Sequence, residues 1–526
     1  MQRTSLIPIL LAAAVTSCGG GGATGLPPLT TIPISCTVNA SAPGPALAPL
    51  WRDHYDLSFE HLDYSSEPGL LPLVQSLKPR SWRCSVGRWE ISIPPPPGGD
   101  STDPAVLKTV DREYYRGPNT LLDADDPANY DFTYLDAQLA GIAQTGAEPY
   151  VCFDMMPFTL SSETDPQNAF NFGLGDPALS YSNGIRTAPP AAPAVYARVV
   201  RNTVRHMRGL FAGTTDFGIT WIEIGNEPDL LDAAAAPLPY FWTGTPAEWI
   251  AMYAAIAAEI DSDASIKDLI QLGGGSFAFQ PHEPAPLFLG DFLADVSMNG
   301  RRLDFLSYHS YGDTPAEHLI ALVRLDAIFT TIGMHPTLVN AEWGRALDGL
   351  DPAYNQLEHG LFRTKVMILM QLFGVELAHE ALLRDPLPMD DSLGLIRTGP
   401  AASKPVSDVY EALSKLNETL LALPIVATPD TYFIATTNAA GTRVFVVHAG
   451  DDPAPGVRTR LELGVTSLPW GGASFHATRF VVSDATAGVT IDASWSGLGG
   501  GSFEDTALFG PGPGEGRFFV WELVKD

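Results

Sequence analysis

Two short segments of the chain run from apolar residues into a glutamate. Residues 221–228 alternate like a β-strand and reach Glu227 just before a proline, and residues 337–344 lead from an apolar run to Glu342. Two carboxylates that meet from separate strands could cleave a glycosidic bond, because one protonates the leaving oxygen while the other attacks the anomeric carbon or activates water. The alternative is a pair of structural acids at strand ends.

Strand alternation in the first segment predicts which residues share a face. Glu223, Gly225 and Glu227 would lie on one side of the strand, with Ile222 and Ile224 on the other. In a parallel barrel the apolar side packs on helices and the first side faces the axis, which places Glu227 at the C-terminal mouth where barrel enzymes carry their chemistry. The alternative role for Glu227 is to cap the following helix.

Four residues next to the glutamates could bind a sugar. Asn226 could bond the sugar 2-hydroxyl, an interaction that strengthens in the transition state, or it could cap the backbone. His309 and Tyr311 share strand parity, so both could point into the mouth, and Tyr311 could hold the carboxylate of Glu342; a buried structural histidine is the alternative for His309. Trp343 could stack on a sugar face or belong to the core.

The elements that would position these residues alternate along most of the chain. From about residue 50 to residue 420, short apolar runs alternate with longer helical patterns, which indicates βαβ units and a parallel sheet. The runs that we interpret as buried strands are residues 56–59, 81–86, 148–153, 220–224, 269–273, 303–308, 337–340 and 375–379. Eight such units predict an α/β fold, a (β/α)8 TIM barrel, with a doubly wound sheet as the alternative.

One helix of this region is marked by its apolar spacing. A single helical face would carry Trp249, Met252, Tyr253, Ile256 and Ile260. Thr245 and Pro246 stand at the positions of an N-cap and a first-turn proline. The triple glycine at residues 273–275 is not followed by the residues of a phosphate-binding loop, so we interpret it as the end of a barrel strand.

The pattern changes after about residue 420. Short β runs follow one another without a helical pattern, at residues 432–436, 443–447, 458–463, 477–482 and 517–523. The segment 438–441 between the first two is typical of a hairpin turn. Residues 421–526 are therefore predicted to form a β-sandwich.

The N-terminus carries the features of a processing signal. Arg3 precedes a short apolar run that is too short to span a bilayer, and residues 15–18 resemble a bacterial lipobox ending in Cys18. We expect residues 1–18 to be a lipoprotein signal peptide, Cys18 to be lipidated, and the Gly/Pro-rich residues 19–49 to be a tether. The protein would then be anchored in the bacterial cell envelope through this lipid alone; an ordinary signal peptide and secretion are the alternative.

Composition limits the partners. The chain has 526 residues and a formal net charge of −29, so it would repel nucleic acid, and a neutral glycan is a better partner. With Cys18 acylated, an odd number of thiols remains (Cys36, Cys84 and Cys152), so at most one disulfide can form. No metal-binding motif is present in the sequence, and we expect neither a metal nor a cofactor.

The two glutamate segments resemble clan A of the glycoside hydrolases. In that clan a Glu after Asn ends the fourth strand as acid/base, and the nucleophile ends the seventh. The resemblance implies that Glu227 is the acid/base and Glu342 the nucleophile of a retaining mechanism. Two candidate strands lie between them, as this order requires.

Further segments resemble family 39 of that clan, which includes β-xylosidases and α-L-iduronidases. They cover roughly residues 50–420 with the attached β-sandwich, and they are residues 130–136, 146–157, 241–245, 304–312 and 404–410. Arg83 matches the arginine of the family's second strand. The resemblance implies a β-xylosidase-like hydrolase that acts on oligo- or polysaccharides.

The chain departs from the family at several positions, which leaves the sugar open. Gly225 stands where the family usually has Trp, Asn340 and Ala341 replace the more usual Thr, and Ser85 lies near the position of a family histidine. The glycine also resembles family 79, the heparanase-like β-glucuronidases. An endo-acting polysaccharidase, such a β-glucuronidase and a non-catalytic glycan-binding lipoprotein remain the alternatives.

Overall fold

A computed structural model gives the arrangement of most of the chain. It describes residues 30–41, 44–55, 69–86, 113–154, 156–163, 187–213, 215–232, 238–239, 241–278, 287–345, 357–381, 383, 394–397, 402–416, 419–421, 425–428, 431–450, 457–483, 486–509 and 518–526. The chain divides into two compact units, residues 48–415 and residues 1–47 with 416–526. The expected signal peptide and the lipidated Cys18 lie outside the described residues.

The larger unit is built around a closed barrel of eight strands, each parallel to its neighbours. In chain order the strands are β2 (Asp53–Tyr55), β3 (Ser81–Ser85), β4 (Glu148–Phe153), β5 (Trp221–Ile224), β8 (Gln271–Phe277), β9 (Phe305–Tyr311), β10 (Thr337–Gly344) and β11 (Val375–Glu380). The TIM barrel is confirmed and the doubly wound sheet is wrong, because β11 closes onto β2. The first strand lies at Asp53–Tyr55 rather than at residues 56–59, which are outside the described residues.

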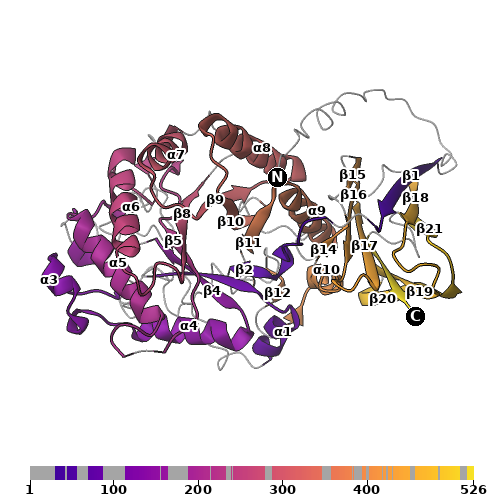
Figure 1. Ribbon diagram of the computed structural model, residues 1–526, viewed down its shortest axis with the longest axis horizontal. Helices are drawn as coiled ribbons and strands as arrows, with labels where there is room; N and C mark the ends of the chain where they lie inside the picture. Colours follow the sequence, from indigo (N-terminus) through magenta and orange to yellow (C-terminus); the bar gives the residue numbers. More distant parts are fainter. Residues whose placement is uncertain are drawn as a thin grey trace, which may run out of the picture. The chain divides into compact units, whose positions relative to one another are not determined.

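Helices surround the barrel strands (Figure 1). They are α1 (Leu70–Ser76), α3 (Leu121–Ala124), α4 (Thr133–Thr145), α5 (Pro193–Met207), α6 (Pro246–Asp261), α7 (Leu287–Asn299), α8 (Pro315–Ile332), α9 (Leu357–Phe373) and α10 (Pro405–Leu413). Short 3-10 turns lie at Leu50–Arg52, Pro127–Asn129 and Phe158–Leu160. Two small hairpins accompany them, β6 (Leu231–Asp232) with β7 (Leu238–Pro239) and β12 (Ile396–Arg397) with β13 (Ala402–Ser403).

Helix α6 forms as its sequence predicts. Thr245 is the N-cap, its side chain accepts from the backbone N–H of Glu248, and the Glu248 carboxylate accepts from the backbone N–H of Thr245. All five residues of the expected apolar face are buried: Trp249, Met252, Tyr253, Ile256 and Ile260. The helix is therefore held by a capped start and by one buried stripe against the barrel.

Side chains fill the interior of the barrel. A cluster of Tyr150, Phe305, Val339, Ala341 and Leu377 comes from four strands and leaves the axis packed. The triple glycine lies in β8, as expected. A Cβ on residue 273 would lie 2.1 Å from the Phe305 carbonyl, and one on residue 274 would lie 2.5 Å from the Ile224 backbone. Glycine there lets β8 approach both of its neighbours closely.

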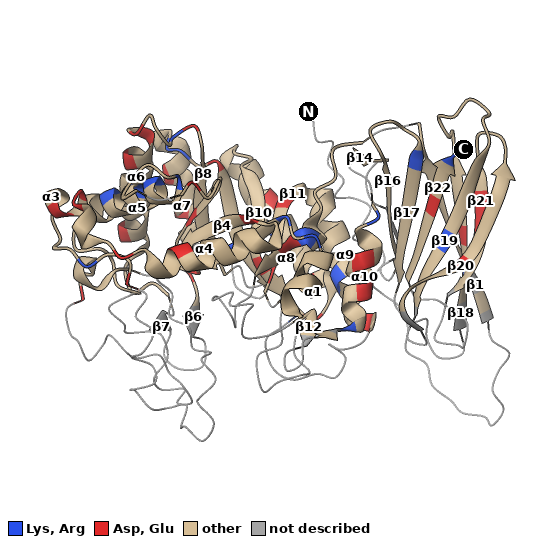
Figure 2. Cartoon of the chain, turned by 90° about the horizontal axis from the view of Figure 1, so that it is seen from below, with Lys and Arg blue, Asp and Glu red and all other residues tan. Residues whose placement is uncertain are grey.

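Charged residues on the outer helices pair with one another. Figure 2 shows acidic and basic segments together on α5 and α6. Arg201 on α5 contacts Glu259 on α6 at 2.8 Å and Asp125 at 3.0 Å. Such partly exposed pairs contribute little each, so the packing of the two helices is the main stabilising term. Among the described residues, no helix is long and apolar enough to cross a membrane.

The smaller unit consists of sheets that are antiparallel except for the pair of β1 and β18, as expected for the C-terminal β-sandwich. Its strands are β1 (Thr30–Asn39), β14 (Thr419–Leu420), β15 (Ile425–Thr428), β16 (Thr431–Thr437), β17 (Arg443–Gly450), β18 (Val457–Thr466), β19 (Phe475–Ser483), β20 (Thr486–Leu498), β21 (Phe503–Phe509) and β22 (Phe518–Lys525). One sheet has the order β1-β18-β21, and the larger one contains β14 to β17, β19, β20 and β22. The sequence patterns missed β14, β15, β20 and β21.

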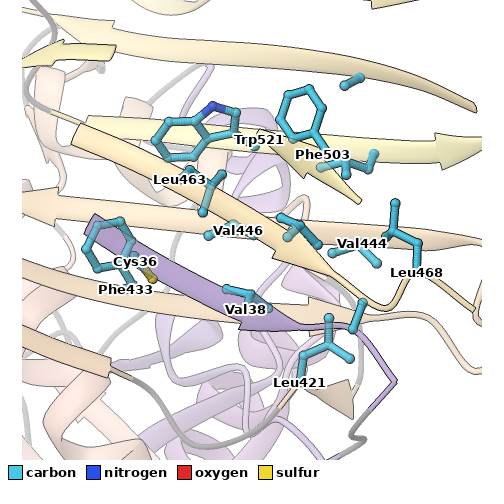
Figure 3. Packing of buried hydrophobic residues seen from close by; sticks show 14 of the residues in the cluster. Cys36, Val38, Leu421, Phe433, Val444, Val446, Leu463, Leu468, Phe503 and Trp521 are labelled. Carbon is cyan, nitrogen blue, oxygen red and sulfur yellow. The ribbon is translucent and has the colours of Figure 1, made fainter. Parts of the chain in front are cut away.

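The tether expected over residues 19–49 needs correction in its middle. Residues 30–39 form β1, which pairs in parallel with β18. Cys36 and Val38 of β1 are buried in the same cluster as Phe433 and Trp521 (Figure 3). The alternation of Ile34, Cys36 and Val38 with polar residues is a strand signal that the overall Pro and Ser content of this segment concealed.

Candidate active site

The two glutamates lie at the C-terminal ends of two barrel strands. Glu227 follows β5, the fourth strand of the barrel, and Glu342 lies near the end of β10, the seventh. The side chain of Glu227 is 13% exposed and that of Glu342 is 8% exposed. The expected strand order is confirmed, and both carboxylates reach the same mouth of the barrel.

His309 on β9 lies between the two carboxylates. Its Nδ1 is 2.7 Å from Oε1 of Glu227 and 3.8 Å from Oε2 of Glu342. Those two oxygens therefore cannot lie farther apart than the sum of the two distances, 6.5 Å. The His309 side chain is 1% exposed, so its ring is held inside the barrel wall. The expectation that His309 points into the mouth agrees with this geometry.

Two further side chains hold the carboxylate of Glu342. The Tyr311 hydroxyl donates a hydrogen bond to Oε1 of Glu342, and Arg83 approaches Oε2 with its Nη1 at 3.3 Å. Burial and the neighbouring carboxylate raise the pKa of Tyr311 well above its usual value, so its phenol stays a donor. One oxygen of Glu342 thus receives a neutral donor, and the other lies against a guanidinium.

Asn226 is oriented from below by the same arginine. Arg83 Nη2 donates to Oδ1 of Asn226 at 2.8 Å, and Asn226 is 3% exposed. Because the amide oxygen is engaged, the amide NH2 is the group available to a ligand. Arg83 lies over the ring of Tyr55 on β2, at 4.8 Å from the ring centroid, which fixes the plane of the guanidinium.

Sequence reasoning did not single out Glu223 as a site residue. Its carboxylate is fully buried; it accepts from Arg83 Nε at 2.9 Å and from the Tyr150 hydroxyl at 2.9 Å. Burial alone would raise the pKa of Glu223, but Arg83 and hydrogen bonds, led by that of Ser276, outweigh it and lower the pKa. An acid on the axis-facing side of an otherwise apolar strand was the signal that could have found it.

Strand alternation does not extend to Glu227. Strand β5 ends at Ile224, and Gly225 and Glu227 both have positive φ, +83° and +43°. The backbone N–H of Glu227 donates to the carbonyl of Ser276 at 3.0 Å, and Ser276 itself has φ +40°. Non-glycine residues at positive φ are strained, and surrounding contacts must hold them there. A turn, rather than the pleat, therefore aims Glu227 at the mouth.

No protein-family model matches the chain. Solved structures share its architecture. The glucosidase from Croceicoccus marinus is 17% identical with a TM-score of 0.65, over 94% of this chain and 100% of its own. The family 39 glycoside hydrolase from Xanthomonas axonopodis pv. citri is 16% identical, TM-score 0.63, over 94% and 98%. The monomeric β-xylosidase from Caulobacter crescentus CB15 is 15% identical, TM-score 0.63, over 94% and 99%.

The chain shares the fold of these solved glycoside hydrolases. Position 225, where the expected family pattern has Trp, holds a glycine for a steric reason. A Cβ on Gly225 would lie 3.0 Å from the Trp249 ring of α6, so that ring already fills the space beside the turn. Glycine also accommodates the positive φ that precedes Asn226.

The expectation that Trp343 is a sugar platform is wrong. Trp343 is fully buried; its ring lies edge-on to His318 of α8, and its Nε1 donates to the Ala378 carbonyl at 3.1 Å. The register of β10 shifts between Asn340 and Glu342. This bulge turns Glu342 toward the axis and the next residue toward the helices, which residue spacing alone did not reveal.

The three remaining cysteines do not form disulfides. Cys36, Cys84 and Cys152 are buried and none of them is in a disulfide. Cys152 lies beside Arg83, with its Sγ 3.5 Å from Nη2, and burial raises the pKa of its thiol. Among the described residues no group of His, Cys, Asp and Glu could hold a metal ion.

Proposed function

We propose that the protein is a retaining glycoside hydrolase with Glu342 as nucleophile and Glu227 as acid/base. The observation that carries this proposal is the convergence of both carboxylates on His309, which limits one pair of their oxygens to 6.5 Å. Retaining enzymes hold their carboxyl groups about 5–5.5 Å apart, whereas inverting enzymes need about 6.5–9.5 Å to admit a water. Because this upper limit coincides with the lower end of the inverting range, it supports retention.

The reaction would proceed by two displacements. In the first, an oxygen of Glu342 bonds to the anomeric carbon while the glycosidic C–O bond breaks, and Glu227 gives its proton to the leaving oxygen. In the second, Glu227 takes a proton from water as the water oxygen attacks the anomeric carbon and releases Glu342. The enzyme returns to its starting protonation state after both steps.

The surrounding side chains would support these steps. Tyr311 and Arg83 keep the Glu342 carboxylate fixed, which reduces the reorganisation that attack requires. The amide NH2 of Asn226 would donate to the sugar 2-hydroxyl. His309 touches Glu227 at 2.7 Å and would orient the acid for proton transfer to the leaving oxygen.

Local charge favours a neutral sugar. Glu227 and Glu342 place two carboxylates at the barrel mouth, and Glu223 lies beneath them, where Arg83 contacts both Glu223 and Glu342. A uronate would bring a further negative charge into this buried cluster, which opposes binding. We therefore propose a β-xylosidase-like substrate, with a neutral glycan ranked ahead of the β-glucuronide that Gly225 suggested.

We also propose that Cys18 carries a lipid anchor in the cell envelope. The lipobox-like residues 15–18 and the glycine run that follows them support this location. Glycan substrates outside the cytoplasm would then be accessible to the barrel.

Hydrolysis of a panel of aryl glycosides by the purified chain tests the function. We expect release from a neutral β-glycoside such as a xyloside, its loss in Glu342→Ala, and a first-formed sugar of unchanged anomeric configuration by NMR. An inverted product would exclude the retaining mechanism. Binding of glycans without hydrolysis across the panel would support the non-catalytic lipoprotein instead.

A further inference from the structure

A second layer of contacts lies beneath the two glutamates, centred on a carboxylate that does not reach the mouth. Glu223 on β5 is fully buried, with no exposed side-chain surface. Its two oxygens accept from three residues on three other strands: Arg83 on β3, Tyr150 on β4 and Ser276 on β8. A buried carboxylate satisfied from three strands is held in one position.

The first connection of Glu223 leads through Arg83 to Glu342. Arg83 makes a charged contact with Glu223 Oε2 at 2.9 Å, and its remaining N–H groups reach Asn226 at 2.8 Å and Glu342 at 3.3 Å. Of the two carboxylates, Glu223 lies closer to the guanidinium than Glu342 does, so Arg83 is held mainly by Glu223 and reaches from there to the site. One positive charge is thus divided between two carboxylates.

The second connection of Glu223 leads through Ser276 to Glu227. The Ser276 hydroxyl donates to Glu223 Oε1 at 2.5 Å, and the carbonyl of the same serine accepts the backbone N–H of Glu227 at 3.0 Å. Ser307 fixes the serine from the other side by accepting its backbone N–H at 2.9 Å. Ser276 and Glu227 both hold positive φ, a conformation that needs such support.

We propose that Glu223 is a positioning residue that sets the geometry of both catalytic glutamates, that of Glu342 through Arg83 and that of Glu227 through Ser276. This inference rests on the proposed function. Glu223 touches no substrate; it divides the charge of Arg83, so that Glu342 is oriented without being fully neutralised. It also holds the strained turn that aims Glu227 at the leaving oxygen.

The test is Glu223→Gln, which keeps the shape and removes the charge. With its partner neutral, Arg83 acts undivided on Glu342, which stabilises the carboxylate and makes it a weaker nucleophile. We expect kcat/KM to fall about 10- to 100-fold and the acid limb of its pH profile to move to lower pH. The other groups facing Arg83 and Glu342 are unchanged in this variant: Tyr55, Cys152, Glu227, His309 and Tyr311.

Glu380 provides a matched control. It is a buried glutamate at the end of β11 that pairs with Arg363 of α9 and accepts from the Tyr410 hydroxyl of α10 at 2.6 Å. Glu380→Gln disturbs an arginine–tyrosine pairing of the same kind outside the site, so it should lower thermal stability without moving the pH profile. Ser276→Ala removes the hydroxyl of the second connection and, with it, a long 3.4 Å contact to Arg83, but it keeps the charged contact of Arg83 with Glu223. It should therefore slow glycosides with poor leaving groups and leave the acid limb in place.

A crystal structure of Glu223→Gln gives a readout that needs no activity. We expect Arg83 to leave Asn226 and turn toward Glu342. The inference is overturned if Arg83, Asn226 and Glu227 keep their positions, or if the pH profile of an active Glu223→Gln matches that of Glu380→Gln. If the wild-type chain cleaves no glycoside, the proposed function fails on its own, and the structure of the variant still decides the positioning role.

Discussion

At the scale of single residues, the two catalytic glutamates differ in their contacts. Glu342 is held by Arg83 and Tyr311, whereas Glu227 contacts His309 and is the more exposed of the two. A carboxylate fixed by a guanidinium and a phenol suits attack, and one that faces the opening suits proton transfer to a departing group. These differences give the two residues separate, testable roles.

Azide distinguishes the roles of the two glutamates. Glu227→Ala should lower activity on natural glycosides by about 100- to 10,000-fold, while the first step on a dinitrophenyl glycoside should survive, because that leaving group needs little protonation. The covalent intermediate on Glu342 should then accumulate, and azide should release it as a product of retained configuration. Azide with Glu342→Ala should give the inverted product instead, because it attacks the substrate directly. An exchange of these outcomes between the variants would reverse the roles.

A substitution of Trp343 tests whether its ring is part of the core rather than a sugar-binding surface. Its ring is buried against α8, so Trp343→Phe should lower the free energy of unfolding by about 1–3 kcal/mol through lost packing and the lost bond to Ala378. KM for a glycoside should stay within about twofold of the wild-type value, because the ring does not face the mouth. A large rise in KM with unchanged stability would show that the ring binds sugar after all.

At the scale of elements, the layer between β10 and α8 contains a buried, titratable side chain. His318 lies on α8 beside Trp343; its Nδ1 is 2.8 Å from the Ser310 hydroxyl, and burial lowers its pKa to about 4. The folded barrel therefore keeps this ring neutral, while the unfolded chain takes up a proton near pH 6.5. Lowering the pH from about 6.5 to about 4 therefore favours the unfolded chain.

His318→Gln should therefore reduce the acid sensitivity of the barrel. In the wild-type chain, His318 contributes a loss of stability that begins as pH falls below about 6.5 and levels off near its folded value, amounting to about 3 kcal/mol at most. The variant should be less stable than the wild type at pH 7.5, and the gap should narrow toward pH 4.5. Chemical denaturation at both pH values measures this; a gap that stays constant would show that the folded ring already carries its proton at pH 4.5.

At the scale of the whole molecule, the N-terminal residues serve two different parts of the protein. Residues 30–39 complete a sheet of the smaller unit, and the expected anchor at Cys18 lies twelve positions before the first of them. A lipid at Cys18 would thus connect to the membrane a unit that has its own buried core. A single lipid chain gives only weak, reversible membrane binding, so stable anchoring without a membrane-spanning helix takes two signals, such as dual acylation.

Cys18→Ser should release the protein from membranes of its native host. Lipidation needs the thiol, so the variant should move to the soluble fraction while hydrolysis of an aryl glycoside in solution stays as in the wild type. Fractionation followed by blotting measures the distribution, and Cys36→Ser, which removes a buried thiol, is the control that should stay with the membrane. A wild-type chain that is already soluble would exclude the anchor.

The sequence by itself determined the features that depend on local order along the chain. Alternation and helical spacing identified seven of the eight barrel strands and the buried face of α6, because these periods follow from the geometry of the elements themselves. Strand order then followed from the sequence, and with it the meeting of Glu227, His309, Tyr311 and Glu342, because the C-terminal ends of all strands in a parallel barrel share one mouth.

Only the tertiary structure decided the features that depend on irregular backbone and on contacts between distant segments. The bulge in β10 sent Trp343 into the core, and the positive-φ turn at Glu227 replaced the expected pleat. Strand β1 joined residues more than four hundred positions away, and Glu223 met partners from three other strands. A pattern with a fixed period cannot report a shift of register, and it carries no information on which distant side chain completes a buried carboxylate.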